Sequence, residues 1–316
     1  MRCRKCRAPA WLDLPRHRTA FCREHFLDYF RDQVTRAIRE WRMICPGERV
    51  LVAVSGGKDS LALWDVLLEL GYPADGLFIG LGIGGYSSRS REKTLAFARS
   101  RGAKLLVVDL EERWKGVEEL ARRARRVPCS ACGLVKRYLF NRVAREEGYE
   151  VVATGHNLDD EAASLLGNVL RWQTGYLARQ SPVLPEEEGF ARKVKPLVRL
   201  TERETAAYAF TRGIDYVLEE CPLAAGASSL LYKEVLNRLE LESPGTKQQF
   251  LQGFLERVRP WFEEKEAGPE LRPCLTCGQP TTAGVCAFCR LLERAGVKSG
   301  ESPDLEVKGE EAASFG

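Results

Sequence analysis

The sequence lacks any apolar run that approaches the roughly 20 residues needed for a membrane-spanning helix. Its first seven residues are polar and basic and include two cysteines, so they lack the apolar core of a secretory signal peptide. These absences exclude a membrane-embedded protein and favour a cytoplasmic one. Hydrophobic residues make up 44% and charged residues 29%, as in ordinary globular proteins, and 316 residues can form one large core or two modest domains with appendages.

Methionine and asparagine are also scarce, with two and four residues, whereas arginine and glutamate are abundant. This composition is typical of thermophilic proteins. Residues 1–26 hold seven basic residues against two acidic ones, and residues 299–316 hold five acidic residues against one lysine. The basic end suits a polyanionic partner, although a solvated surface would have the same composition, and the acidic end predicts a disordered tail.

Eleven cysteines in a chain expected in the cytoplasm do not predict a disulfide framework. Eight of the Cys and His residues form closely spaced pairs, the arrangement that holds a structural zinc ion tetrahedrally. The two predicted zinc sites are Cys3, Cys6, Cys22 and His25, and Cys274, Cys277, Cys286 and Cys289. The N-terminal segment is too short to have a core, so metal would supply most of its folding energy; the alternative is free thiols. Cys45 stands alone and is assigned no role.

A third set combines Cys129-x2-Cys132, at the start of an expected helix, with the distant Cys221. Three thiols are one short of the four that close a structural zinc site or a fully ligated iron–sulfur cluster. A cubane cluster held by three thiolates would leave one iron with a free coordination position. The alternatives are a redox pair that carries a persulfide, and a third zinc ion completed by water or His156.

Four arginines lie just upstream of this pair and could grip the phosphates of a nucleic acid, although such a run is more often a solvated helix face. They are Arg122, Arg123, Arg125 and Arg126.

Residues 49–60, RVLVAVSGGKDS, organise the chain. They predict a buried strand, a glycine-rich loop and the start of a helix, an arrangement that holds phosphate through backbone N–H groups and the helix dipole. The loop is not a Walker A loop, because Val52 stands where the first Gly of that motif is required and Asp59 replaces its Ser or Thr. It resembles instead the PP-loop of the ATP pyrophosphatases, which split ATP between the α- and β-phosphates.

A second motif, TGHNLDDEA at residues 154–162, follows a predicted buried strand and begins a helix. Asp159 and Asp160 in its first turn could hold Mg²⁺ on the ATP phosphates or polarise the substrate. Acids in a first turn also simply complement the helix dipole. Because the SGGKDS loop is also present, we prefer the functional interpretation and expect Asp160 to be the acid that holds Mg²⁺ or polarises the substrate.

Strands and helices are expected to alternate, which predicts an α/β fold with a doubly wound parallel sheet and a ligand at the carboxyl ends of the strands. The expected strands lie near 50–54, 77–81, 104–108 and 151–154, and the expected helices near 27–43, 59–70, 88–101, 114–124, 134–147, 158–171, 201–241 and 246–264. The expected domains are an N-terminal zinc module (1–26), a linking helix (27–48), a PP-loop catalytic domain (49–265), a C-terminal zinc module (266–297) and a disordered tail (298–316).

Gly80-x-Gly82-x-x-Gly85 satisfies the dinucleotide-binding fingerprint, with Asp109 as a possible ribose ligand. However, it would follow the second strand, and the SGGKDS loop already occupies the first phosphate-binding turn. These glycines are therefore expected to allow close approach to the adenosine of ATP, beside Ile79.

Taken together, SGGKDS, TGHNLDD, the Cys129-x2-Cys132 pair with Cys221, and a Cys/His module at each end resemble the tRNA 2-thiouridine synthetase family over about residues 3–290. The similarity is greatest to its thermophilic branch, which converts 5-methyluridine 54 of tRNA into 2-thio-5-methyluridine. The resemblance implies an adenine nucleotide α-hydrolase-like PP-loop domain, flanked by zinc modules, in an ATP-dependent tRNA sulfurtransferase that forms AMP and pyrophosphate.

The resemblance also implies roles for individual residues. Cys129, Cys132 and Cys221 would hold a 4Fe-4S cluster, and Lys136, Asp160 and Asp59 would be the catalytic polar groups, with Mg²⁺ on the ATP. The implied ATP-binding residues are Ala53, Ser55, Gly56, Gly57, Lys58, Asp59, Ser60, Ile79 and Gly155. ATP would adenylate the uracil C2 oxygen before sulfur replaces it, with sulfur arriving as the thiocarboxylate of a ubiquitin-like carrier protein; a homodimer is also implied.

Other functions remain open at this point. Relatives within the resemblance thiolate the wobble uridine or cytidine 32. A zinc-ribbon RNA-binding protein with a non-catalytic PP-loop would bind tRNA without forming AMP, and a PP-loop amide synthetase would turn over ATP with glutamine and without RNA.

Overall fold

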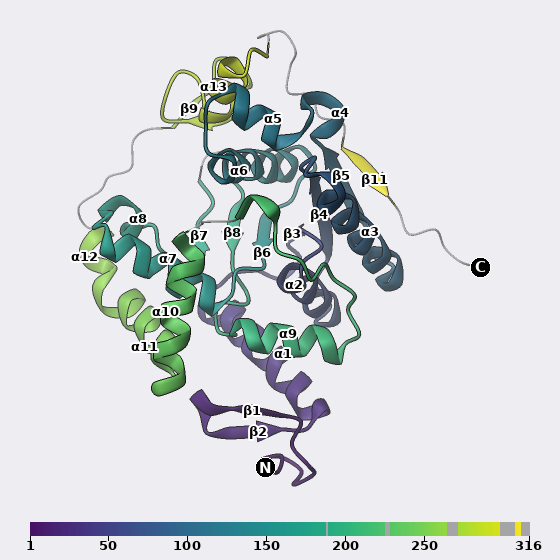
Figure 1. The fold of residues 1–316 in the computed structure, drawn as a ribbon, viewed down its shortest axis with the longest axis vertical. Coiled ribbons are helices and arrows are strands. Elements are labelled where there is room, and N and C mark those ends of the chain that lie inside the picture. Colours follow the sequence, from purple (N-terminus) through teal and green to yellow (C-terminus); the bar gives the residue numbers. More distant parts are fainter. Residues whose placement is uncertain (188, 225–227, 264–270, 298–306, 311–316) are drawn as a thin grey trace.

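The computed structural model describes the chain except residues 188, 225–227, 264–270, 298–306 and 311–316. A seven-stranded sheet lies at its centre, with helices on both faces (Figure 1). The order of its strands is β11-β5-β4-β3-β6-β8-β7. They are β3 (Val50–Val54), β4 (Ala74–Gly80), β5 (Leu105–Asp109), β6 (Val151–Thr154), β7 (Val183–Leu184), β8 (Arg192–Val194) and β11 (Lys308–Glu310).

The five inner strands of this sheet run parallel, and the two edge strands β7 and β11 run antiparallel to their neighbours. Strand β3 is apolar on both faces because helices cover both, as expected for a parallel sheet. The chain passes from β3 to β4 on one side and later returns to β6 on the other. The predicted doubly wound, mostly parallel sheet is thus confirmed, with its switch point between β3 and β6.

Two hydrophobic cores lie on opposite faces of the sheet because successive residues of a strand point to opposite sides. Val50, Val52 and Val54 face the first core, and Leu51 faces the second. The first is covered by α1 (Arg23–Glu40), α2 (Lys58–Glu69), α3 (Gly84–Arg101) and α9 (Glu202–Thr211). The second is covered by α4 (Glu111–Trp114), α5 (Gly116–Arg123), α6 (Pro128–Glu146) and α13 (Ala287–Arg294).

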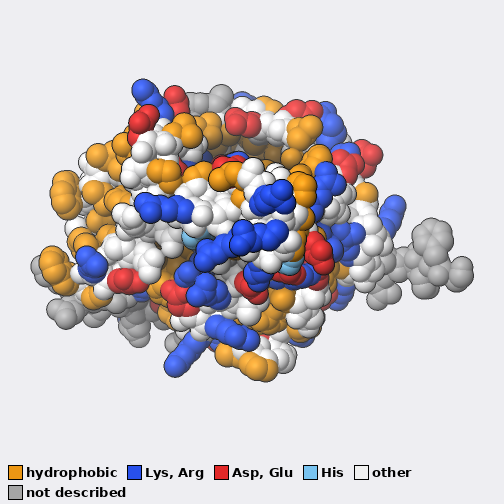
Figure 2. All heavy atoms as spheres, turned by 90° about the horizontal axis from the view of Figure 1, so that it is seen from below, with side chains coloured by type: hydrophobic (Ala, Val, Ile, Leu, Met, Phe, Trp, Pro, Cys, Tyr) orange, Lys and Arg blue, Asp and Glu red, His pale blue; other side chains and the backbone are white. Residues whose placement is uncertain are grey.

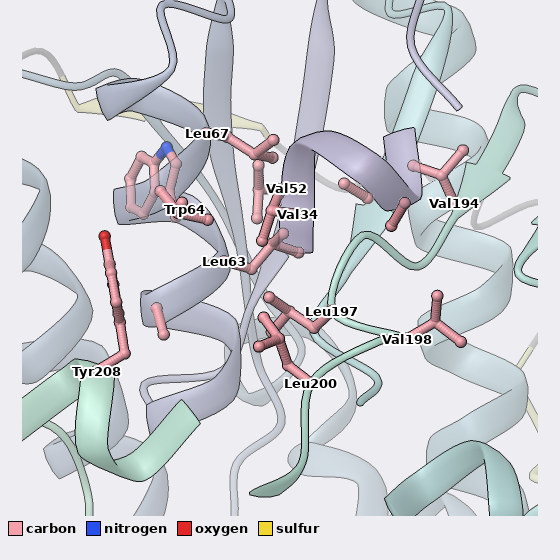
Figure 3. Close-up of a cluster of buried hydrophobic side chains, with 14 of the residues drawn as sticks. Val34, Val52, Leu63, Trp64, Leu67, Val194, Leu197, Val198, Leu200 and Tyr208 are labelled. Atoms are coloured by element: carbon pink, nitrogen blue, oxygen red, sulfur yellow. The ribbon is translucent and has the colours of Figure 1, made fainter. Parts of the chain in front are cut away.

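Trp64 is the largest side chain of the first core and is fully buried beside Leu63, Leu67 and Val52 (Figure 3). Its indole Nε1 donates a hydrogen bond to the Ala74 carbonyl oxygen, 2.9 Å away. A Cβ on Gly76 would lie 2.5 Å from the indole ring, so only glycine in β4 leaves room for this tryptophan.

The N-terminal segment forms a hairpin of β1 (Leu12–Leu14) and β2 (Thr19–Phe21) around a 3₁₀ turn, η1 (Pro15–His17). Helix α1 follows and packs on α9, where the rings of Phe30 and Tyr208 stack with their centroids 3.9 Å apart. The expected linking helix therefore exists, although it begins earlier than predicted, directly after Cys22.

Helices and short strands after α6 complete the fold. Between β6 and β8 lie α7 (Leu158–Leu170) and α8 (Thr174–Ala178). After α9 come η2 (Pro222–Ala224), α10 (Ser228–Glu242), α11 (Thr246–Gly253), η3 (Phe254–Val258) and α12 (Pro260–Glu263). Of the C-terminal cysteines, Cys274 and Cys277 lie in the turn between β9 (Arg272–Pro273) and β10 (Pro280–Thr281), whereas Cys286 caps α13 and Cys289 lies in it.

Two predictions about these segments are wrong. A helical stretch over 201–241 is interrupted, because Gly213 adopts a left-handed conformation (φ +63°) just after α9, and residues 212–221 then cross the sheet edge without helical structure. The tail is not disordered at Lys308–Glu310, which pair antiparallel with β5 and satisfy the unpaired backbone groups of that strand. The remainder of the tail lies outside the described residues, apart from Val307.

Among the described helices, none combines the length and the apolar character that crossing a bilayer requires.

Arg16, in the turn of the N-terminal hairpin, fixes this hairpin to α9. Its guanidinium lies 2.6 Å from Glu204 of α9, with side chains only 5% and 2% exposed, and also donates to the Arg199 carbonyl oxygen. We expect Arg16→Met to lower the free energy of unfolding by about 3–5 kcal/mol, because Glu204 would stay buried without its partner. Urea unfolding of the full chain measures this.

The matched control is Arg203→Gln, which breaks the exposed ion pair between Arg203 and Asp13 at the same junction. This change should cost about 1 kcal/mol or less. Equal, small losses in both variants would contradict the anchoring role of Arg16.

Candidate functional site

A cavity of about 320 Å³ opens at the carboxyl ends of β3, β4 and β6, at the switch point of the sheet. Its wall includes predicted residues from each sequence motif: Ala53, Ser55, Asp59, Ser60, Ile79, Cys132, Lys136, Gly155 and Cys221. The predicted residues Gly56, Gly57, Lys58, Cys129 and Asp160 lie outside this wall. Segments from different parts of the chain, from Ala53 to Cys221, are thus brought to one place.

The PP-loop wraps around the hydroxyl group of Ser60. The Ser60 Oγ accepts a hydrogen bond from the Ser55 N–H at 3.1 Å and donates one to the Gly57 carbonyl oxygen at 3.0 Å. Gly56 has φ +75°, and a Cβ there would lie 2.6 Å from the Ser90 carbonyl oxygen, so no other residue fits. Gly57 caps α2, whose first N–H groups are suited to an anion.

Polar side chains from three helices meet beside this loop. The Lys58 ammonium lies 3.0 Å from Asp59 and 2.7 Å from Glu202, the first residue of α9. The Asp59 Oδ1 accepts hydrogen bonds from Asn157 at 3.1 Å and from the Thr205 hydroxyl at 2.5 Å. Burial alone would lower the pKa of Lys58, but Asp59 and Glu202 outweigh it and raise that pKa, so Lys58 stays charged.

The two acids of the TGHNLDD motif have different surroundings. Asn157 and Asp160 form a capping box at the start of α7, and Asp160 also lies 2.6 Å from the Lys233 ammonium of α10. Asp159 is 4% exposed and is held by the Glu202 N–H and by Lys247. These contacts make Asp159 part of the buried framework of the fold, whereas Asp160 is half-buried and pairs with Lys233.

Glu202, Thr205 and Lys233 belong to this site although the sequence analysis did not select them. Burial would lower the pKa of Lys233, but Asp160 and Glu202 raise it above its ordinary value. Conversely, burial would raise the pKa of Glu202, and Lys58 and Lys233 lower it. No local motif marks these residues; the only sequence signal is the capping box formed by Thr201 and Glu204, which fixes where α9 begins.

The third cysteine set gathers at the rim of the same cavity. Helix α6 begins at Pro128, so Cys129 and Cys132 lie in its first turns, and Lys136 follows Cys132 by four residues on the same side. Cys221 arrives on the segment after α9, which is pinned to the PP-loop by a 2.9 Å hydrogen bond from the Val217 N–H to the Gly56 carbonyl oxygen. The Cys129 thiol donates to the Leu223 carbonyl oxygen at 2.8 Å.

The spacing of these three thiols does not suit a single ion. Within the described part of the chain, the groups compact enough for one ion are the two terminal Cys/His sets, and this trio is not among them. His156, the suggested fourth ligand of a third zinc ion, contacts the Thr154 hydroxyl at 2.8 Å. Because Cys132 and Cys221 line one cavity from two segments and the three thiols are too widely spaced for one ion, the set fits a cluster better than one zinc ion.

Each terminal Cys/His set is compact. In the N-terminal set, the Cys6 and Cys22 sulfurs lie 3.8 Å apart, and the His25 Nδ1 lies 3.2 Å from Cys22 and 3.6 Å from Cys3. In the C-terminal set, the Cys274–Cys289 and Cys277–Cys286 sulfur distances are 3.9 Å and 3.8 Å. A tetrahedron with Zn–S bonds of about 2.3 Å has edges of about 3.8 Å, so both sets have the dimensions of a zinc site.

The C-terminal set is attached to the helix that carries Cys129, Cys132 and Lys136. The rings of Tyr138 and Phe288 stack with centroids 3.8 Å apart, and the Asn141 amide donates to Gln279 at 2.9 Å. This module therefore supports α6 from the side opposite the cavity.

The glycines at the end of β4 and after it have different surroundings. A Cβ on Gly82 would lie 2.7 Å from the Gly116 Cα, so Gly82 is needed where two loops cross. Ile79 lines the cavity, but Gly80, Gly82 and Gly85 do not. The expectation that these glycines approach adenosine therefore stays a prediction.

Basic side chains are frequent on the face that carries the N-terminal hairpin. Figure 2 shows Lys and Arg side chains across the middle of this face, with acidic side chains between them. Near Cys129, two of the four arginines, Arg122 and Arg123, contact Glu119 of the same helix at 2.7 Å and 2.6 Å. Their guanidinium groups remain partly exposed to solvent on α5.

Comparison with known proteins gives matches along almost the whole chain. Residues 2–27 match the family model of the N-terminal LIM domain of 2-thiouridine synthetase TtuA, and residues 27–222 match the model of the PP-loop domain. A protein of Thermus thermophilus named tRNA-5-methyluridine(54) 2-sulfurtransferase is 60% identical over 93% of this chain and 91% of its own length. Its namesake from Pyrococcus horikoshii is 44% identical over 92% of this chain and 93% of its own length.

Among solved structures, the chain is similar to the U34-tRNA thiolase NcsA from Methanococcus maripaludis, which was solved with its 4Fe-4S cluster. The two superpose with a TM-score of 0.79 and 25% identity, over 93% of this chain and 96% of the other.

Proposed function

This chain belongs to the tRNA 2-thiouridine synthetase branch of the PP-loop family, and we propose that it is the tRNA sulfurtransferase that makes 2-thio-5-methyluridine at position 54. The observation that carries this proposal is the single cavity that joins the PP-loop, Lys136 and two cysteines of the third set. The names of the relatives from Thermus thermophilus and Pyrococcus horikoshii support position 54.

The PP-loop would bind ATP with the adenosine beside Ala53, Ile79 and Gly155 and the phosphates at the start of α2. The uracil C2 oxygen is a poor leaving group, so it first attacks the α-phosphate of ATP; an O–P bond forms, and the bond to pyrophosphate breaks. The Lys58 ammonium and the N–H groups of the loop would stabilise the charge that develops on the phosphates. Asp160 would hold Mg²⁺.

Lys136 lines the cavity from α6, between the nucleotide-binding loop and the cysteines. Its ammonium would stabilise negative charge on the adenylated base as sulfur adds to C2 and AMP leaves. A 4Fe-4S cluster held by Cys129, Cys132 and Cys221 would supply an iron without a protein ligand as a binding position for sulfide. A persulfide on one of these cysteines is the alternative chemistry.

Two zinc ions would complete the terminal modules, in Cys3/Cys6/Cys22/His25 and Cys274/Cys277/Cys286/Cys289. The sulfur-to-sulfur distances in both sets support zinc. The basic N-terminal module and the arginines beside Cys129 would bind the phosphates of tRNA, whose target base must leave its stack to enter the cavity.

The family resemblance also supports a ubiquitin-like protein with a C-terminal thiocarboxylate as the sulfur donor, and a homodimer. For the dimer, α10 offers the exposed apolar side chains Leu231, Val235 and Leu239. Analytical ultracentrifugation of the purified chain tests the dimer, which is expected to sediment with twice the mass of one chain.

Nucleoside analysis of tRNA tests the proposed function. Protein purified without oxygen is incubated with Mg-ATP, sulfide and tRNA whose pyrimidines still carry oxygen at C2. The tRNA is then digested and its nucleosides are analysed by mass spectrometry. We expect 2-thio-5-methyluridine and one pyrophosphate per thiolation. Thiolation of wobble uridine 34 or cytidine 32 instead would reject position 54, and tRNA binding without pyrophosphate would favour a non-catalytic RNA-binding protein.

A further inference from the structure

We propose that Lys233 of α10 is a positioning residue for the adenylation step, acting on Asp160 directly and on Lys58 through Glu202. This inference rests on the proposed function, because it assigns the PP-loop the task of cleaving ATP. It adds two residues, Lys233 and Glu202, to those that the motifs identify.

Lys233 and Glu202 close a ring of polar side chains around the PP-loop, which we call the charge ring. Its members, in order, are Lys58, Glu202, Lys233, Asp160, Asn157 and Asp59. Lys58 contacts Glu202 at 2.7 Å, Glu202 contacts Lys233 at 3.2 Å, and Lys233 contacts Asp160 at 2.6 Å. Asp160 accepts from the Asn157 N–H at 3.0 Å, the Asn157 amide donates to Asp59 at 3.1 Å, and Asp59 lies 3.0 Å from Lys58.

Three helices begin at the charge ring. Lys58, Asp160 and Glu202 lie in the first turns of α2, α7 and α9. Acids in these positions would complement the helix dipoles in any protein. Lys233, however, lies inside α10, so its charge is placed here by the packing of α10 rather than by a helix terminus.

The packing of α10 against α7 fixes the position of Lys233. Leu236 of α10 is buried against Ala162 and Ala163 of α7. A Cβ on Gly167 of α7 would lie 2.8 Å from the ring of Tyr232, the residue before Lys233, so glycine is needed for this approach. The Lys233 and Asp160 side chains are only 21% and 26% exposed, so the pair is partly shielded from solvent.

A purely structural role for Lys233 is already filled by another lysine. Lys247 of α11 is buried, pairs with Asp159 and donates to Asn237 of α10. This pair ties α7, α10 and α11 together, and among the described members of the charge ring Asp159 accepts a hydrogen bond only from the backbone N–H of Glu202. Lys233 instead pairs with the Glu202 carboxylate, which in turn contacts the Lys58 ammonium of the PP-loop, and this points to the reaction.

The charge ring holds three carboxylates against two ammonium groups, so it keeps one negative charge. That charge favours the Mg²⁺ ion that accompanies ATP. Lys233 prevents Asp160 and Glu202 from repelling each other, and it thereby holds the Asp160 carboxylate at the start of α7 while Glu202 orients the Lys58 ammonium. Catalysis depends on this placement, because misplacing a charged group in the site weakens its effect on the transition state.

The test measures pyrophosphate release at saturating tRNA over a range of ATP concentrations. Lys233→Met, which retains the length of the side chain without its charge, should lower kcat about 30-fold and change the KM for ATP less than about 3-fold. Lys233→Arg should retain at least about a third of the wild-type kcat. Arg238→Met is the control, because Arg238 is exposed on the same helix, and its kcat should equal that of the wild type.

Glu202→Gln provides a second variant that retains side-chain volume. It should lower kcat about as much as Lys233→Met, and the double variant should be no slower than the slower single variant, because both act through one ring. Thermal unfolding of each variant is measured alongside.

Each outcome decides between the proposals. If the wild-type protein releases no pyrophosphate with tRNA, the proposed function fails. If it does and Lys233→Met has the wild-type kcat, only the role of Lys233 is rejected. A kcat that falls equally in Lys233→Met and Lys233→Arg, with equally lowered melting temperatures, would make Lys233 a structural residue and also reject the inference.

Discussion

Lys136→Ala is expected to lower the rate of tRNA thiolation about 10²- to 10³-fold, the usual cost of removing one charged group that stabilises a transition state. The reason is its position: Lys136 is the cation that α6 directs into the cavity, four residues after Cys132 and in the same cavity wall as Asp59 and Cys221. Neutralising it leaves negative charge on the adenylated base without a partner. Rates of 2-thionucleoside and AMP formation on the same tRNA measure the effect.

Arg137→Ala is the matched control for this variant. Arg137 is the next residue of α6 but is exposed on the outer side of the helix. It should retain most of the wild-type activity. The iron and zinc contents of Lys136→Ala should equal those of the wild type, since no metal ligand is changed, and full activity of this variant would remove Lys136 from the mechanism.

Cys221→Ala is expected to abolish thiolation and to remove iron from the protein while zinc remains. Protein purified without oxygen should contain about four irons and about two zincs per chain and absorb broadly near roughly 400 nm. Cys221 is part of the cavity wall and comes from the segment fixed to Gly56, so its loss leaves only Cys129 and Cys132 to hold a cluster. Metal analysis and absorption spectra of the same sample measure both effects.

Cys45→Ala is the control, because Cys45 is exposed and belongs to no cysteine set. It should retain iron, zinc and activity. If wild-type protein that has never been exposed to air contains zinc but no iron, the sulfur carrier would be a persulfide on Cys129, Cys132 or Cys221 instead of a cluster. Full thiolation by Cys221→Ala would reject Cys221 as a ligand of a cluster and also as a carrier of a persulfide.

Local sequence patterns were enough to predict the parts of the site that are formed by residues close together in the chain. The SGGKDS loop, the capping box at Asn157 and the paired cysteines each carry their geometry in the sequence, because a glycine turn, a helix terminus or a Cys-x2-Cys turn is fixed by near neighbours. The parallel sheet followed from the alternation of apolar strands and helices, and its order placed the cavity at the switch point.

Other features carried a signal that could have been used. Gly213, followed by the Cys221-Pro222 pair, marks the end of α9, yet the helical interpretation continued to 241. The edge strand β11 could not be foreseen, since three residues in an acidic tail gain their structure only from the unpaired edge of β5.

The sequence by itself determined which groups are available for chemistry, because the PP-loop, the acids of α7 and the three cysteine sets are each contained in short motifs. Only the tertiary structure decided which groups act together. Glu202 contacts Lys58, 144 positions away in the chain, and Lys233 contacts Asp160 only because α10 packs on α7. The hydrogen bond from Val217 to Gly56 fixes the segment that carries Cys221 to the PP-loop. Such contacts depend on packing between distant helices, which leaves no periodic or local trace in the sequence.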